Sequence, residues 1–147
     1  QGEVIGINTA VAGGAENIGF AIPINEVTSV IESVKKNGRI VRSWLGVRYL
    51  LVNKAVASAN KLSVDYGALV LRGEKESDLA VVPGSPADKA GLVENDIILE
   101  IDGVKIDENH PLQKAIARHA PGDKINLKIF HKGEEKNIDV TLEELKE

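Results

Sequence analysis

The stretch from Gly84 to Gly103, GSPADKAGLVENDIILEIDG, constrains the fold more than any other part of this 147-residue chain. Ser85 is a residue type that caps helix N-termini, a proline follows it, and Asp88 can reach back toward the N–H of the cap. Gly91 falls where a short helix needs a left-handed residue. An apolar run, Ile97 to Ile101, then ends at an Asp-Gly turn signal. The stretch therefore predicts a short capped helix followed by a buried strand.

Residues 44–147 continue this mixed pattern of short strands and helices. Strands are expected at 44–52, 66–71, 79–82 and 104–106, and alternating apolar residues indicate two more at 125–129 and 138–142. Helices are expected from Asn53 to Lys61 and from Leu112 to His119. This part of the chain is therefore expected to be self-contained.

Residues 1–38 read as two strands and a helix. Apolar runs at 4–7 and 18–24 indicate strands on either side of a Gly-rich loop, and Asn25 is expected to cap a helix that closes at Gly38. A hairpin and one helix bury too little apolar surface to be stable alone, so we expect the end of a larger domain, followed by a linker at 39–43. The open strand edges are expected to pair with another copy, to pack on the second unit or to be poorly ordered.

Charge is unevenly spread along the chain, which has a net charge of −4. Residues 33–64 carry seven basic side chains and no acidic one, which favours an anionic partner group, although a solvated linker gives the same pattern. An aromatic content of 3% and a pI of about 5.5 exclude the basic footprint of nucleic-acid binding. Cysteine is absent and the three histidines show no metal-ligand spacing, so no metal or cofactor is expected.

Ser43 to Val47 form the candidate ligand-binding loop. A glycine there lets backbone N–H groups converge on a ligand such as a carboxylate. If the following strand is an edge, an extended peptide can add to it along the face shared by Leu45, Val47 and Tyr49. The helix that begins at Leu112 would form the other wall. The alternative is that the glycine only relieves a bend and that the apolar face of the strand belongs to the core.

Two sets of motifs resemble one known family. SWLGV, GALV, PGSPADKAGLVENDIILEIDG and PGDKINLKI resemble a bacterial PDZ domain, and GEVIGINTAVAGG with IGFAIPI resembles the end of the protease domain of HtrA-type (DegP, DegQ) serine proteases. The resemblance implies an α+β fold. Residues 1–38 would be a C-terminal fragment of a trypsin-like β-barrel and 39–43 a linker. Residues 44–147 would be a PDZ domain whose short antiparallel strands form a partly open barrel with two or three helices.

The resemblance also implies site residues. Trp44 to Val47 match the carboxylate-binding loop, and Leu45, Val47 and Tyr49 match the pocket for the C-terminal side chain of the ligand. The helix residues implied to line the groove are Leu112, Ala115, Ile116 and His119. Asn8, Thr9 and Ala10 match a segment that lines the specificity pocket of the protease. The chain departs from the family pattern where Asn95 replaces a glycine and where the loop at 72–78 is longer. Since Asn tolerates a left-handed turn, the fold is expected to survive.

The catalytic serine of the family lies in a Gly-Asn-Ser-Gly-Gly motif just before the segment that GEVIGINT matches. The 147 residues contain neither that motif nor a Gly-x-Ser-x-Gly frame, and all three histidines lie in the PDZ-like part. We therefore expect the chain to begin after the catalytic serine and not to hydrolyse peptides itself.

The function implied by the resemblance is that of a peptide-binding regulatory PDZ module. Its parent would be a serine endopeptidase of protein quality control in the periplasm or cell envelope. The module would bind hydrophobic C-termini or unfolded peptides of misfolded proteins by strand addition. The rest of the protease domain and further copies of the chain are the other expected partners. Two alternatives stay open: half of a protease completed by other chains, and a scaffold or secretion PDZ protein without a protease.

Overall fold

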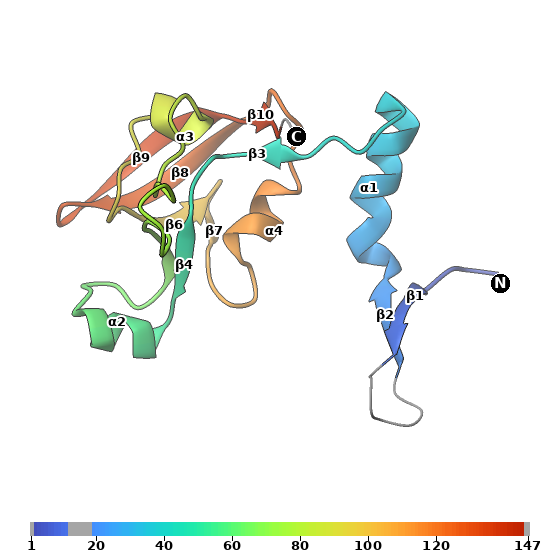
Figure 1. Ribbon diagram of the computed structural model, residues 1–147, viewed down its shortest axis with the longest axis horizontal. Coiled ribbons are helices and arrows are strands. Elements are labelled where there is room, and N and C mark those ends of the chain that lie inside the picture. Colours follow the sequence, from blue (N-terminus) through green and yellow to red (C-terminus); the bar gives the residue numbers. More distant parts are fainter. Residues whose placement is uncertain (1, 12–18, 146–147) are drawn as a thin grey trace. The chain divides into compact units, whose positions relative to one another are not determined.

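The computed structural model describes residues 2–11 and 19–145, which divide into two units, Gln1–Val41 and Arg42–Glu147. The first unit contains β1 (Gly6–Val11), β2 (Gly19–Pro23) and α1 (Ile24–Asn37), with β1 and β2 antiparallel (Figure 1). The predicted Gly-rich loop between these strands lies outside the described residues.

The prediction that Asn25 caps α1 is wrong, because the helix already begins at Ile24 and Asn25 lies in its first turn. The N–H of Ile24 donates to the carbonyl of Ile5 at 3.0 Å, so the residue just before β1 satisfies the first amide of the helix. Pro23 precedes it in an extended conformation without a side-chain cap. The helix ends as predicted at Gly38, which is left-handed and donates to the carbonyl of Val34 at 2.8 Å.

The second unit is built on an open antiparallel sheet with the strand order β4-β5-β6-β8-β9, and β7 also pairs with β6 (Figure 1). A separate ladder joins β3 to β10. The sheet does not close into a barrel. Its strands are β3 (Ser43–Trp44), β4 (Tyr49–Val52), β5 (Gly67–Val70), β6 (Ile97–Ile101), β7 (Val104–Lys105), β8 (Lys124–His131), β9 (Glu134–Thr141) and β10 (Glu143–Glu144). The helices are α2 (Lys54–Asn60), α3 (Pro86–Lys89) and α4 (Leu112–Ile116).

The central strand β6 is buried on both faces, which explains its continuous apolar run. Ile98 and Ile101 belong to the main core, whereas Ile97 and Leu99 pack in a second cluster on the other side. The second cluster is closed by α2, whose predicted cap is confirmed: the side chain of Asn53 accepts from the N–H of Val56 at 3.0 Å. The sheet is therefore covered on both faces near its centre.

The capped helix predicted after Gly84 is confirmed as α3. The hydroxyl of Ser85 accepts from the N–H of Asp88 at 3.2 Å, and Gly91 has a φ of +81°. One detail differs: the carboxylate of Asp88 accepts from Gly84 at 2.8 Å rather than from Ser85. The N–H of Ser85 is already bonded to the carbonyl of Val82 at 3.1 Å, so it is not available to Asp88.

Three predicted elements are shorter in the structure. The strand expected at 44–52 is interrupted because Gly46 has a φ of +88°, which no extended strand adopts. The strand expected at 79–82 is reduced to one bridge, Val47 to Val81. The helix expected to reach His119 ends at Ile116, and the N–H of His119 instead makes a tight 3.1 Å bond to the Ile116 carbonyl. Asn95 adopts a left-handed φ of 75°, as the replacement of glycine predicts.

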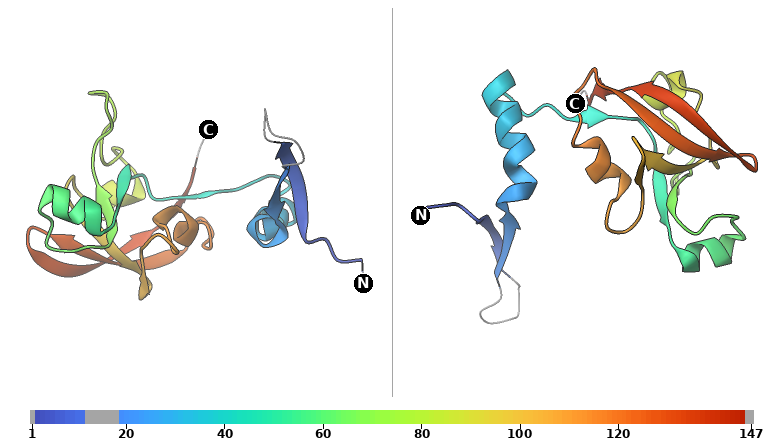
Figure 2. Two further views of the ribbon diagram at one scale, coloured as in Figure 1. Left: turned by 90° about the horizontal axis from the view of Figure 1, so that it is seen from below. Right: turned by 180° about the vertical axis from the view of Figure 1, so that it is seen from behind.

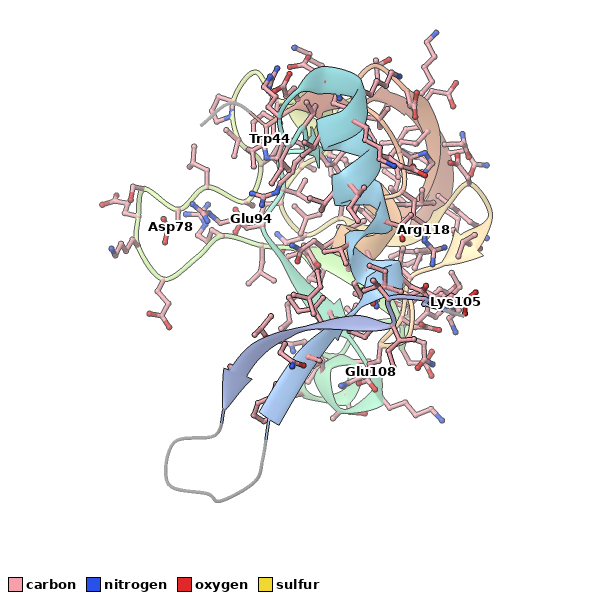
Figure 3. All side chains as sticks on the ribbon, turned by 90° about the vertical axis from the view of Figure 1, so that its right-hand side faces the viewer. Trp44, Asp78, Glu94, Lys105, Glu108 and Arg118 are labelled. Atoms are coloured by element: carbon pink, nitrogen blue, oxygen red, sulfur yellow. The ribbon has the colours of Figure 1, made fainter. Side chains whose placement is uncertain are left out.

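The loop between β5 and α3 projects from the sheet, as the left view of Figure 2 shows. Its base is closed by Gly73, whose N–H donates to the carbonyl of Asp78 at 2.8 Å. Arg48 contacts the carboxylate of Asp78 at 3.3 Å, and Arg72 makes a two-pronged contact to Glu94 at 2.8 and 2.6 Å. The two acidic partners, Asp78 and Glu94, are labelled in Figure 3. Ion pairs thus join the loop to Arg48, just before β4, and to Glu94, between α3 and β6.

Candidate functional site

In the loop 45–47, the first two carbonyl groups are fixed by α3 and by the chain that leads into α3. The carbonyl of Leu45 accepts from Ala87 at 2.9 Å, and that of Gly46 accepts from Val82 at 2.9 Å. No hydrogen-bond partner is recorded for the N–H groups of Leu45, Gly46 or Val47 among the described residues. Three consecutive amides with no recorded partner, in a loop whose first two carbonyls are held elsewhere, form a potential anion site, because an anion can accept from several of them together.

Gly46 is required at the centre of this loop. Its φ of +88° is costly for any residue with a side chain, and a Cβ there would lie 2.2 Å from the Cβ of Ser85. The ring of Trp44 comes within 3.2 Å of the same point. Ser85 is fully buried, so it cannot move aside into solvent. The glycine therefore permits the close approach of Ser85, whereas its role in letting backbone N–H groups converge on a ligand stays a prediction.

β4 is an edge strand of the described sheet, and its backbone alternation leaves one side open. The N–H of Arg48 donates to Ala80 at 2.8 Å, and its carbonyl accepts from Leu71 at 3.2 Å. Because successive backbone groups of an extended chain point in opposite directions, those of Val47 and Tyr49 point away from these partners. An extended peptide could pair with them.

The structure gathers six of the predicted peptide-contact side chains in one apolar cluster. Leu45 and Leu112 are completely buried, as the core alternative predicts for them, whereas Val47, Tyr49 and Ala115 are half-buried at its margin. The remaining member, Ile116, is 9% exposed. The half-buried members thus leave an apolar margin beside the open edge of β4.

His119 lies apart from this cluster. Its Nε2 is 3.6 Å from the carboxylate of Asp102 in the β6–β7 turn. Its carbonyl accepts from the hydroxyl of Ser43 at 2.5 Å. His119 thus ties the end of α4 to the chain that enters the loop, and its role as a peptide contact stays a prediction.

In the first unit, Asn8, Thr9 and Ala10 lie on β1 and are exposed. Asn8 is paired with Ala21, and the hydroxyl of Thr9 donates to the carbonyl of Phe20 at 3.3 Å. Their predicted place in a protease specificity pocket stays a prediction.

The electrostatics beside the loop are set by exposed ion pairs. Arg48, predicted as a possible electrostatic aid to a carboxylate, is paired with Asp78. Hydrogen bonding to the Arg72 guanidinium lowers the pKa of Glu94, and the same contact raises the pKa of Arg72. The amides of residues 45–47 are therefore the stronger candidates for holding an anion, because no competing group in the described part of the chain is bonded to them.

A shallow hollow beside α2 is a second place where a ligand could sit. Its lining residues are Lys54, Ala57, Ser58, Lys61, Leu62, Ser63, Val64, Asp65 and Tyr66. The ring of Tyr66 is covered by the amino group of Lys105, 3.9 Å from its centroid. Among the described residues there is no cluster of three acidic or histidine side chains that could hold a metal, here or elsewhere. No helix in the described ranges is long and apolar enough to cross a membrane.

Ser85 is the residue whose contribution to this site sequence reasoning missed. The sequence predicts Ser85 only as the cap of α3, but this residue also shapes the loop through Gly46. No local signal reveals this contact, because the two residues are 39 positions apart.

Comparison with known proteins gives matches over nearly the whole chain. Residues 43–142 match the family model described as PDZ domain. A probable periplasmic serine endoprotease, DegP-like, from Marinomonas sp. is 38% identical over 146 residues, 97% of this chain and 29% of that protein. One of the same description from Chlamydia trachomatis is 37% identical, over 99% of this chain and 28% of that protein. The chain thus spans about three tenths of the length of these relatives.

Solved structures of serine proteases are similar to this chain as well. The HtrA-type protease AlgW with a decapeptide superposes with a TM-score of 0.78 at 30% identity, over 99% of this chain and 43% of that chain. AlgW with a tripeptide gives a TM-score of 0.75 at 30% identity, with 99% and 47% covered. The serine endoprotease from Yersinia pestis gives 0.64 at 27% identity, with 99% and 44% covered.

Proposed function

Because this chain belongs to the PDZ domain family and is homologous to DegP-like, HtrA-type serine endoproteases, we propose that its second unit binds the C-terminal end of an extended peptide. The observation that carries the proposal is the loop 45–47. Its carbonyls are bonded to Ala87 and Val82, while its three amides have no partner in the described structure. A free peptide carboxylate can accept hydrogen bonds from such amides.

The peptide would then continue along β4 as an added antiparallel strand. The outward backbone groups of Val47 and Tyr49 would pair with it, which supplies affinity independent of sequence. Its last side chain would rest on the apolar margin formed by Val47, Ala115 and Ile116. Apolar C-terminal residues are therefore the preferred ligands. The similar HtrA-type protease AlgW, solved with a decapeptide and with a tripeptide, supports peptide binding.

For the parent protein we propose a serine endoprotease of the periplasm or cell envelope, as the descriptions of the relatives indicate. The module would present exposed apolar C-termini of misfolded proteins to the protease domain or regulate that domain. The chain itself would not hydrolyse peptides, because its 147 residues contain no Gly-x-Ser-x-Gly nucleophile motif.

The fluorescence of Trp44 provides the test, because this tryptophan is the only one and lies beside Gly46. A peptide with a free apolar C-terminus should change the emission in a saturable way. The same peptide with an amidated C-terminus is the matched control and should bind at least tenfold more weakly. Equal titrations for the two peptides would contradict a carboxylate site.

A further inference from the structure

The segment that leaves α1 is held to the helix by Ser33. The hydroxyl of Ser33 accepts a hydrogen bond from the N–H of Val41 at 2.8 Å and donates to the carbonyl of Arg39 at 3.2 Å. Gly38, with a left-handed φ of 71°, turns the chain at the end of the helix and allows this return. One half-buried side chain therefore engages the segment on both sides of Ile40.

The hydroxyl of Thr28 in the same helix makes a different kind of contact. It donates to the carbonyl of Ile24 at 3.1 Å, which is the usual bond of such a residue to the preceding turn of its own helix. The hydroxyl of Ser33 instead bonds to the segment that follows the helix. Because its partners lie only six and eight residues further along the chain, this contact needs nothing beyond α1 and that segment.

The chain is anchored again at the next residue, where the second unit begins. The carbonyl of Arg42 accepts from the N–H of Leu145 at 2.9 Å, and Ser43 pairs with Glu144 in the ladder of β3 and β10. The expected linker at 39–43 is therefore bonded near both of its ends. The backbone between these anchors is confined to the junction of Val41 and Arg42.

We propose that Ser33 is a latch that sets how far the second unit can reach from α1. While the latch is closed, only the junction of Val41 and Arg42 is free to rotate. When the two bonds of Ser33 break, residues 39–41 are released and can extend the connection by about 10 Å, at roughly 3.3–3.6 Å per residue. The two forms differ by two ordinary hydrogen bonds, so both are populated at equilibrium. This inference goes beyond the proposed function and does not depend on peptide binding.

Amide hydrogen exchange of the intact chain tests the latch by comparing two neighbouring residues. The N–H of Val41 is bonded to Ser33, whereas no partner is recorded for the N–H of Ile40 among the described residues. After correction for intrinsic rates, the amide of Val41 should exchange about tenfold more slowly than that of Ile40, as two hydrogen bonds of ordinary strength imply. Equal rates in the unsubstituted chain would overturn the latch, and this comparison needs no variant.

Three variants of α1 separate the latch from the helix itself. Ser33→Ala should remove the difference between the two amides and speed trypsin cleavage after Arg39, because the segment is released. Thr28→Ala removes a hydroxyl that does not contact the segment and should change neither quantity. Ser33→Thr retains the hydroxyl and should keep the amide of Val41 protected. Circular dichroism shows whether the helix is formed in each variant.

Two results with these variants would also overturn the latch. The first is a Ser33→Ala chain in which α1 is formed and the amide of Val41 is still protected. The second is a Thr28→Ala chain that loses this protection as fully as Ser33→Ala does, since the effect would then come from the helix rather than from the contact of Ser33 with the segment.

Discussion

Ser85 occupies the space that a side chain at Gly46 would need. An added Cβ on Gly46 would lie 2.2 Å from the Cβ of Ser85, and the serine hydroxyl lies 3.4 Å from the Gly46 carbonyl. The cap of α3 and the candidate ligand loop are therefore one structural unit. The stretch that identifies the fold also holds the site in shape.

Gly46→Ala should abolish binding at the loop and destabilise the second unit. The added methyl group meets buried Ser85 as well as an unfavourable φ, so we expect a loss of about 2–4 kcal/mol in the free energy of unfolding. Gly122→Ala is the matched control, since Gly122 has a φ of +94° and open space around its Cβ position. It should cost only about 1 kcal/mol. Urea denaturation measures both, and similar losses would contradict the steric role of Ser85.

Ser85→Ala should lower the free energy of unfolding by about 1 kcal/mol, because α3 loses its cap. It should also weaken binding of an apolar C-terminal peptide, since Gly46 loses one of its two recorded supports. Asp123→Ala removes a comparable bond, from the N–H of Ala120 at 2.8 Å, away from the loop. That control should cost similar stability and leave affinity unchanged. If Asp123→Ala weakens peptide binding as much as Ser85→Ala does, the effect of Ser85→Ala is not specific to the loop.

The Arg72–Glu94 ion pair should make stability depend on pH in the acid range. The pKa of Glu94 is lowered in the folded state, so its stabilisation is present above the ordinary pKa of about 4.3. It is lost as the pH falls through the lower folded pKa. The Glu94→Gln variant should therefore have a slightly lower melting temperature than the unsubstituted chain at pH 7. This difference in melting temperature should disappear under acid conditions.

The control for this effect is Glu76→Gln. Glu76 lies in the projecting loop that also contains Arg72, and no ion pair is recorded for it in the described structure. The same charge is removed, but the melting difference should not show the same pH dependence. If the difference in melting temperature between Glu94→Gln and the unsubstituted chain is the same at every pH, the result contradicts an ion pair in the folded state.

The first unit should make the chain associate with itself. Ile5 is 85% exposed and Phe20 58%, and exposed apolar patches of this kind mark interaction surfaces. The double change Ile5→Ser and Phe20→Ser should shift sedimentation velocity profiles toward the monomer. Val104→Ser, a 44% exposed residue of the second unit, should leave them unchanged. Profiles of a monomer at all concentrations before any substitution would exclude association.

Local signals in the sequence predict much of the fold. Each of three capping residues acts on the helix end next to it: Ser85 and Gly91 on α3, and Gly38 on α1. The continuous apolar run of β6 likewise indicates that this strand is buried. Such features can be predicted from neighbouring residues. The start of α1 could not be predicted, because it depends on a bond between Ile24 and distant Ile5. Tertiary pairing likewise decides where the strands stop.

The candidate site was predictable only in part. The likeness to a family identified the loop and the two apolar walls, and the cluster around Val47 and Ala115 is present. The contact between Tyr49 and Gln113 joins residues 64 positions apart and depends on the orientation of one side chain. Sequence spacing contains no information about such a contact.

The most direct test of the central claim is an amide map by ¹H–¹⁵N NMR during titration with an apolar C-terminal peptide. The account predicts large shifts for the amides of Gly46, Val47 and Tyr49, and a smaller one for Arg48, whose N–H is already bonded to Ala80 at 2.8 Å. Shifts confined to the hollow beside α2, around Lys61 and Tyr66, with none at residues 45–49, would contradict it.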